Sequence, residues 1–125
     1  MNREDVMAWV ARYEQAWREN DVAAVRTLFT KDARYARSPY DDALSGHAEI
    51  EDFWPEDTEF TVSSEPVAVE GDIAVVRLEV HYLGPHPHEY RDLWLLRFAE
   101  DGRVADFEEW AHWPGLHYTA PQTPA

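Results

Sequence analysis

The chain has 125 residues, enough for one domain with a substantial core and too few for two. Its 25 acidic and 11 basic side chains give a formal net charge of −14, which would repel the phosphates of nucleic acids and of anionic membranes. The absence of cysteine excludes disulfides, thiol catalysis and cysteine-ligated metals. With no signal-peptide pattern and no long apolar run, the sequence predicts a cytoplasmic protein that binds neither nucleic acid nor membrane.

The first half of the chain has helical periodicity. Apolar residues recur at helical spacing with charged residues between them, and we expect three helices, over residues 4–19, 22–29 and 47–54. Between the second and the third, the composition indicates a short strand over 33–36 and an exposed loop over 37–46.

The second half alternates with the period of β-strands. Four strands are expected, over residues 59–70, 73–83, 89–99 and 103–111. Short connections make them antiparallel neighbours in a meander, and Gly102 supplies the positive φ that the last turn needs. Helices on one side of an antiparallel sheet define an α+β fold.

The expected domain covers residues 1–113. Residues 114–125 contain three prolines and follow the last expected strand, so we expect them to form a loosely ordered tail.

One carboxylate lies in an otherwise apolar row. Alternation along the strand over residues 89–99 places Asp92 on the same face as Tyr90, Trp94, Leu96 and Phe98. In an apolar cavity its charged form would be disfavoured, and its pKa would rise toward the range useful for acid–base catalysis. Alternatively, Asp92 lies near the sheet edge in water, or pairs with a neighbouring arginine.

Two glutamates follow on the next strand. Simple alternation groups Glu108 with Val104 and Trp110, and puts Glu109 on the other face, so Glu108 is the expected pocket residue unless a bulge intervenes. Facing Asp92, it would raise at least one pKa by like-charge repulsion. The alternative is that both glutamates form cross-strand ion pairs with arginines.

Several segments together resemble a known family. These are Tyr13-Glu14-Gln15-Ala16-Trp17, Asn20-Asp21, Leu28 to Ala33, Pro39-Tyr40, Gly46 to Ile50, Phe53-Trp54, Phe98 to Val104 and Phe107 to Trp110. In this order they are similar to the SnoaL-like family of the nuclear transport factor 2 (NTF2-like) superfamily. The resemblance implies a cone-shaped half-barrel, with three N-terminal helices on a curved antiparallel sheet, a mostly apolar pocket on the concave side, and a homodimer through the sheet.

Aromatic residues come from every element expected to border that pocket. The candidates are Trp17, Tyr35, Phe53, Trp54, Tyr82, Trp94 and Trp110. They favour a flat or cyclic hydrophobic ligand, although in a chain with six tryptophans several must simply fill the core. Tyr40, in the loop after Pro39, is the expected gate, and its hydroxyl could orient a ligand oxygen.

Two functions remain open. The first is a cofactor-independent enzyme of isomerase, cyclase or dehydratase type, with Asp92 as general base, Glu108 as partner acid or orienting group, and Tyr40 as hydrogen-bond donor. The second is a ligand-binding or accessory protein without turnover. The Asp-Arg-Asp arrangement of epoxide-hydrolysing relatives is not reproduced by Asp92, Arg91 and Asp106. No metal or organic cofactor is implied, because the six histidines form no recognisable metal motif and nucleotide and flavin signatures are missing.

An apolar stripe is expected on the outer face of the sheet. Alternation places Ile73, Val75, Leu93 and Leu95 there, opposite the core. Such a surface favours coverage by a second copy of the chain.

Overall fold

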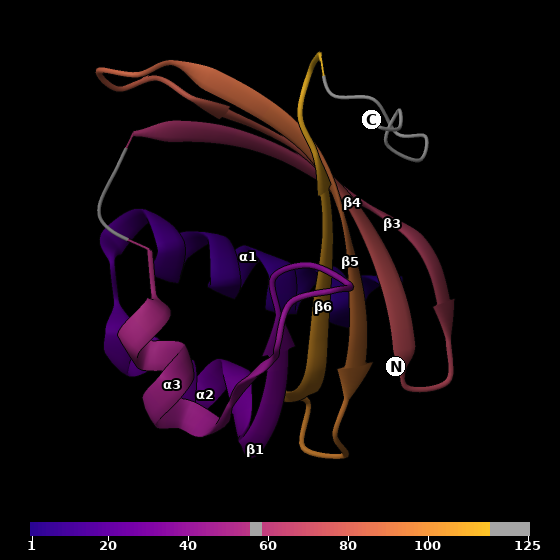
Figure 1. Cartoon of the computed structure of the whole chain (residues 1–125). Helices are drawn as coiled ribbons and strands as arrows, with labels where there is room; N and C mark the ends of the chain where they lie inside the picture. Colours follow the sequence, from indigo (N-terminus) through magenta and orange to yellow (C-terminus); the bar gives the residue numbers. More distant parts are fainter. Residues whose placement is uncertain (56–58, 116–125) are drawn as a thin grey trace, which may run out of the picture.

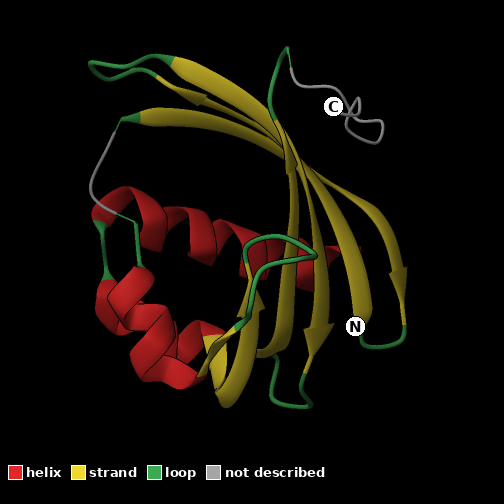
Figure 2. Ribbon diagram, viewed as in Figure 1, coloured by secondary structure: helices red, strands yellow, loops and turns green. Residues whose placement is uncertain are grey.

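A computed structural model describes residues 1–55 and 59–115. Its helical part comprises α1 (Arg3–Glu19), the 3₁₀ turn η1 (Val22–Ala24), α2 (Val25–Leu28) and α3 (Gly46–Phe53). Its strands are β1 (Phe29–Ala36), β2 (Leu44–Ser45), β3 (Phe60–Glu70), β4 (Ile73–Tyr82), β5 (His88–Phe98) and β6 (Val104–His112). Figures 1 and 2 show the helices on the concave side of one strongly curved sheet, which confirms the α+β class.

The sheet has the order β2-β1-β6-β5-β4-β3. The antiparallel meander from β3 to β6 is confirmed. The prediction that all strands are antiparallel is wrong at one edge, because β1 pairs parallel with β6. β1 also begins at Phe29, inside the span expected to be helical, and the two-residue strand β2 was not predicted. Both differences arise from pairing with strands distant in sequence, which local periodicity does not encode.

Helix α1 lies across the concave face (Figure 1). Its N-terminus carries a capping box formed by Asn2 and Asp5, and it ends at Asn20, whose left-handed φ of 50° stops the helix. The buried stripe consists of Val6, Trp9, Val10, Tyr13, Ala16 and Trp17. The Trp9 indole donates to the carbonyl of Leu28 at 2.9 Å, which ties α1 to the start of β1. None of the helices in the described part of the chain is long and apolar enough to cross a membrane.

A β-bulge changes the alternation of β6. Phe98 pairs with Val104, but Arg97 pairs with Asp106, so one extra residue, Ala105, is inserted between the two pairs. Consequently Val104 and Phe107, three positions apart, are both fully buried. The preceding turn is as expected, with Gly102 at φ 87°.

The core lies between the helices and the inner face of the sheet. Along β4 the inner residues Ala74, Val76, Leu78 and Val80 are all buried. The expected tail begins at Pro114, and residues 116–125 lie outside the described residues.

Candidate active site

Asp92 faces the interior, as alternation along β5 predicts. Along the inner face of this strand Phe98, Leu96, Trp94 and Asp92 are all buried, Tyr90 is half-buried and the next residue of the row, at position 88, is exposed. Burial thus ends directly after Asp92. The carboxyl group, 3% exposed, lies at the boundary between the packed core and the open end of the curved sheet, and it is the one buried charged or polar residue of residues 1–55 and 59–115.

The contacts of Asp92 disfavour its ionised form. Oδ2 accepts a hydrogen bond from the Trp94 indole at 3.2 Å, whereas Oδ1 is buried without a hydrogen-bond partner among the described residues. Burial raises the pKa of Asp92 far above its usual range, and the neighbouring carboxyl group of Glu109 raises it further. The bond from Trp94 lowers the pKa but does not offset these effects. The alternatives that place Asp92 in water or in an ion pair are wrong, because the side chain is buried, its hydrogen-bond donor Trp94 is neutral, and it forms no ion pair with the described residues.

Glu109 is the glutamate that faces Asp92. It pairs with Trp94 across β5 and β6 and so shares the inner face with Asp92. The prediction that Glu108 faces the pocket is wrong. Glu108 lies on the outer face, where it approaches Arg34 at 3.6 Å and accepts a hydrogen bond from the Trp110 indole at 2.7 Å. The bulge at Ala105 is the cause, because it moves every later residue of β6 to the opposite face from the one that simple alternation gives.

Two tyrosine hydroxyls form a buried pair beside the carboxyl groups. The Tyr13 and Tyr35 oxygens are hydrogen-bonded at 2.5 Å, and the residues are 4% and 2% exposed. Burial raises the pKa of both phenols well above the usual value, and the negative charges of Glu109 and Asp92 raise it further. Both hydroxyls therefore stay protonated at neutral pH.

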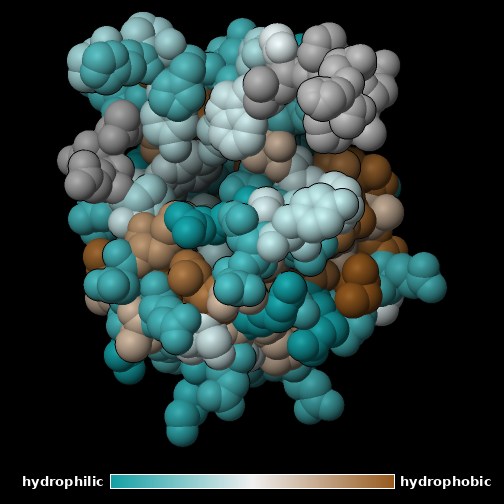
Figure 3. All heavy atoms as spheres, in the orientation of Figure 1, coloured by the Kyte–Doolittle hydropathy of each residue, from teal (hydrophilic) through white to brown (hydrophobic). Residues whose placement is uncertain are grey.

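Tyr82 and Tyr90 border the open end of the inner face. Both are half-buried, and burial is the main cause of their raised pKa values. The charge of Glu109 contributes to both shifts, so these hydroxyls lie near the same carboxyl group. In Figure 3 the molecular surface is hollowed on the face that lies below the tip of the β4–β5 hairpin. Four tyrosines and two carboxyl groups thus converge on the inner face.

The structure divides the predicted pocket aromatics into three groups. Trp17, Tyr35, Trp54 and Trp94 are buried in the aromatic core, and Phe53 and Tyr82 are half-buried against it. Trp110 lies on the outer face opposite Leu93 and is 48% exposed, so its placement in the pocket is wrong for the same reason as that of Glu108.

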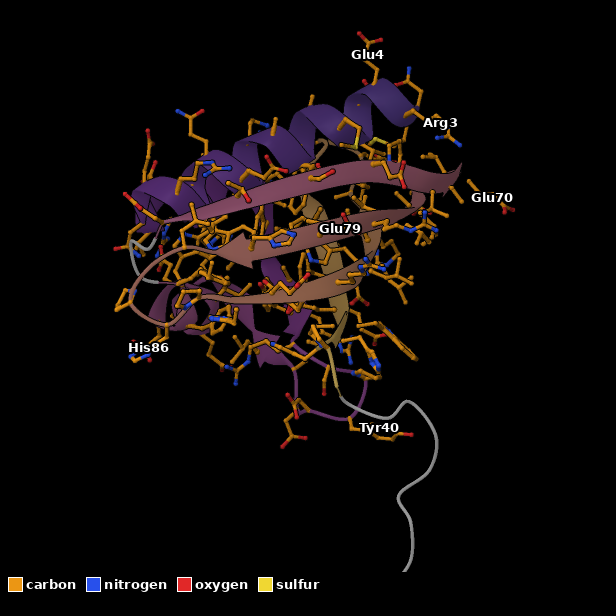
Figure 4. The ribbon with its side chains drawn as sticks, turned by 90° about the horizontal axis from the view of Figure 1, so that it is seen from above. Arg3, Glu4, Tyr40, Glu70, Glu79 and His86 are labelled. Atoms are coloured by element: carbon orange, nitrogen blue, oxygen red, sulfur yellow. The ribbon has the colours of Figure 1, made fainter. Side chains whose placement is uncertain are left out.

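Tyr40 is not brought to the carboxyl pair. It is 97% exposed, and in Figure 4 it projects from its loop at the margin of the molecule. In this arrangement its hydroxyl is not positioned to orient a ligand beside Asp92.

Three members of the site were not among the predicted site residues: Tyr13, Tyr90 and Glu109. Tyr90 shares the alternating row of Asp92, and Tyr13 belongs to the apolar stripe of the first helix, so both carried a usable signal. Glu109 carried no such signal, because its face is set by the bulge at Ala105, and the residues around Ala105 do not indicate a bulge.

Two chemistries lack the residues they need in the described ranges. No group of three or more potential ligands is close enough to hold a metal ion there. Arg91 and Asp106 both lie on the outer face, paired with Glu79 and Arg34 respectively, so they do not form an Asp-Arg-Asp set with Asp92.

A family model described as a SnoaL-like domain matches residues 10–107. The chain therefore belongs to the SnoaL-like family, which confirms the resemblance to this branch of the NTF2-like superfamily.

A solved structure with a similar fold is that of SalBIII, described as an epoxide hydrolase/cyclase-like enzyme with a role in pyran ring formation in the polyether salinomycin. It superposes with a TM-score of 0.69 and 19% sequence identity, covering 85% of this chain and 89% of that chain. At this identity the likeness concerns the fold. Among curated proteins no significant match is found.

Proposed function

We propose that this protein is a cofactor-independent acid–base enzyme that acts on a small hydrophobic molecule. The observation that carries the proposal is the buried carboxyl group of Asp92, with one unpartnered oxygen, beside Glu109 on the neighbouring strand. A buried charge without a cation is costly to maintain, and a titratable group whose pKa is strongly shifted by burial and by a specific neighbour is typical of catalytic sites.

The two carboxyl groups take different roles. Two ionised carboxylates can only accept hydrogen bonds, so they cannot bond to each other. A proton bound to Asp92 gives its unpartnered oxygen a hydrogen to donate and removes the charge repulsion from Glu109. Asp92 is then the general acid. Glu109, half-buried opposite Trp94, is the general base. This assignment replaces the expectation that Asp92 is the base, and it supplies a donor and an acceptor next to each other.

The surroundings favour a flat apolar substrate. Trp94, Tyr90 and Tyr82 lie along the inner face, where the pocket that the family resemblance implies would hold the ligand. Proton transfer next to a carbonyl group, as in an isomerase, cyclase or dehydratase reaction, needs one base and one acid at that position. Membership of the SnoaL-like family and the fold shared with a cyclase-like enzyme support this class of reaction.

Exchange of carbon-bound protons tests the proposal without knowledge of the natural substrate. The probe is 2-tetralone, a flat cyclic ketone with acidic protons beside its carbonyl, incubated with the protein in D₂O and followed by NMR. We expect exchange above the buffer rate, and a loss of at least about tenfold in Glu109→Gln and in Asp92→Asn, the lower range for general acid–base catalysis.

The matched control is Glu108→Gln, the same substitution one residue away on the outer face. It should leave exchange unchanged. If 2-tetralone binds and exchange stays at the buffer rate in the unmodified protein, the alternative function, ligand binding without turnover, replaces the enzyme.

We also propose that a second copy of the chain covers the outer face of the sheet. Ile73 and Leu93 are exposed there, and Val75 and Leu95 are half-buried beside them. Leu95→Glu would place a charge in the middle of that stripe and should shift a dimer to monomer in analytical ultracentrifugation. A dimer that persists in this variant would remove this interface from the proposal.

A further inference from the structure

Strand β3 forms one edge of the described sheet. In the order β2-β1-β6-β5-β4-β3 the two edges are β2, with two residues, and β3, with 11 residues. The backbone groups of an edge strand that point away from its neighbour are open to pairing with another strand. A two-residue edge offers little to pair with, but an edge as long as β3 does.

The register with β4 defines which backbone groups of β3 point outward. The amide of Leu83 donates to the carbonyl of Glu59 at 3.0 Å, so the backbone of Glu59 faces β4. The orientation alternates along an antiparallel strand. The backbone groups of the even-numbered residues from Phe60 to Pro66 therefore point to the open edge.

Two arginines of α1 occupy the ends of this run. Arg18 donates to the carbonyl of Phe60 at 2.7 Å, and its guanidinium lies 4.4 Å from the centre of the Phe60 ring. Arg3 donates to the carbonyl of Pro66 at 2.9 Å. In Figure 4 α1 runs alongside β3, with Arg3 near the end of the strand that carries Glu70. Both bonds come from a charged donor and are stronger than bonds between neutral groups, so an added strand would have to displace them.

The sequence of β3 adds two further obstacles. Pro66 has no N–H, at a position where the N–H would point to the edge. The next residue, Val67, is an extra residue that β4 does not match, and such a bulge ends regular pairing. The usable edge is thus limited to the run from Phe60 to Pro66, and both of its ends are closed.

We propose that the edge of β3 is a strand-pairing site for the same edge of a second copy of the chain, and that α1 holds it closed through Arg3 and Arg18. The inference concerns the edge of the sheet, and it is independent of the acid–base pair and of the outer face. As long as both arginines occupy the edge carbonyls, a second strand cannot form a complete ladder. Once they are removed, the outward backbone groups of two copies can bond to each other.

The run between the two arginines suits pairing with itself. It is centred on Ser63, and two copies related by a two-fold axis at this residue would pair antiparallel. Val62 of each copy then lies opposite Ser64 of the other, and both have outward backbone groups. Glu65 faces Thr61, so no like charges lie directly opposite each other.

The test removes the arginines and measures the mass of the resulting assemblies by analytical ultracentrifugation. Salt at about 0.5 M screens the repulsion between copies that each carry a net charge of −14. In Arg3→Met/Arg18→Met both donors are lost, and methionine keeps an apolar side chain at each position. We expect a species of at least about twice the mass that the unmodified protein forms, because two-fold pairing joins two of its units.

A second variant keeps the packing of Arg18 on Phe60 and opens the other end of the edge. Arg3→Met/Pro66→Thr removes one arginine and restores the missing N–H, so it tests the inference even if the loss of Arg18 unfolds the protein. It should form the same larger species. The matched control is Arg12→Met/Arg26→Met, which removes the same charge from the helices. In the described part of the chain neither of these arginines donates to β3, and the control should keep the mass of the unmodified protein.

A proline distinguishes backbone pairing from general association. Ser64→Pro, added to Arg3→Met/Arg18→Met, removes an outward N–H near the centre of the run and should return the mass to that of the unmodified protein. In the larger species the amides of Val62 and Ser64 should exchange with D₂O more slowly than in the unmodified protein. The inference is overturned if neither opened variant forms a larger species, or if the larger species persists after Ser64→Pro.

Discussion

The two faces of the sheet carry acidic residues in opposite electrostatic settings. On the outer face carboxylates meet arginines: Arg34 lies 3.2 Å from Asp106, Arg77 lies 3.0 Å from Glu65, and Arg91 lies 3.1 Å from Glu79. On the inner face Asp92 has an indole, a second carboxyl group and no cation among the described residues. The same side-chain chemistry is therefore a solvated ion pair on one face and a proton-holding group on the other.

Neighbours on β6 show how small a change in the backbone decides between these settings. Glu108 and Glu109 are adjacent in sequence, yet one lies near Arg34 and the other near Asp92. One bulged residue sets which glutamate is inside. A charge of −14 over the whole chain thus says nothing of which carboxyl groups lie on the inner face.

The largest expected contrast between the faces concerns packing. Phe107 is fully buried and stacks on Tyr35 and Tyr13, whereas Leu95 on the outer face is half-buried. Phe107→Ala should lower the free energy of unfolding by about 3–5 kcal/mol through lost burial and a cavity. Leu95→Ala should cost about 1 kcal/mol, since less apolar area is lost. Urea denaturation of the two variants measures the difference, and equal losses would mean that the inner face is not tightly packed.

The next contrast comes from removing the buried acid. In Asp92→Asn the amide NH₂ can donate to Glu109 while its oxygen still accepts from Trp94. The variant should be more stable than the unmodified protein at pH 8 by about 1–3 kcal/mol, because Asn is neutral in the buried site without the proton that Asp92 must take up from solution on folding. A loss of stability in Asp92→Asn at this pH would contradict the electrostatic setting assigned to the inner face.

The pH dependence of stability sharpens the same comparison. The pKa of Asp92 is higher in the folded protein than in the unfolded chain, where it is about 3.9. Between these two values the folded protein binds a proton that the unfolded chain does not, so stability from this group is complete below pH 4 and falls as pH rises toward the folded pKa. Denaturation midpoints from pH 4 to pH 9 should show this decline, and the decline should be smaller in Asp92→Asn.

The smallest expected effect is on the outer face. The Arg34 guanidinium is about half exposed and its pairs with Asp106 and Glu108 are screened by water. Arg34→Met should change the free energy of unfolding by about 1 kcal/mol or less, and the change should diminish in 0.5 M salt. Thermal unfolding at two salt concentrations checks this, and a loss of several kcal/mol would show that these pairs are structural.

Sequence patterning predicted the elements and one half of the site. The inner row of β5 follows strict alternation, so the position of Asp92 between Tyr90 and Trp94 could be read correctly. The family resemblance, carried by short segments spread along the chain, led to the correct class of fold. Strand alternation therefore predicts a site well where the ladder is regular.

The other half of the site depends on long-range geometry. Glu109 is inside because of a bulge, and Tyr13 meets Tyr35 because α1 packs across a strand that begins earlier than the periodicity indicated. Trp110 and Glu108 were misplaced together, by the same one-residue shift. The residues around Tyr40 have the composition of a turn, which predicted a loop there. They did not indicate that the Tyr40 side chain points into solvent.

The most direct test of the central claim is the pKa of the Asp92 carboxyl group, measured by ¹³C NMR titration with Asp92→Asn as the assignment control. If Asp92 shares a proton with Glu109 in a desolvated site, its carboxyl carbon will not titrate near pH 4, its pKa will lie above neutrality, and Glu109→Gln will move that pKa downward. If the Asp92 carboxyl group titrates close to pH 3.8, and its pKa is the same in Glu109→Gln as in the unmodified protein, the proposed acid–base pair is contradicted.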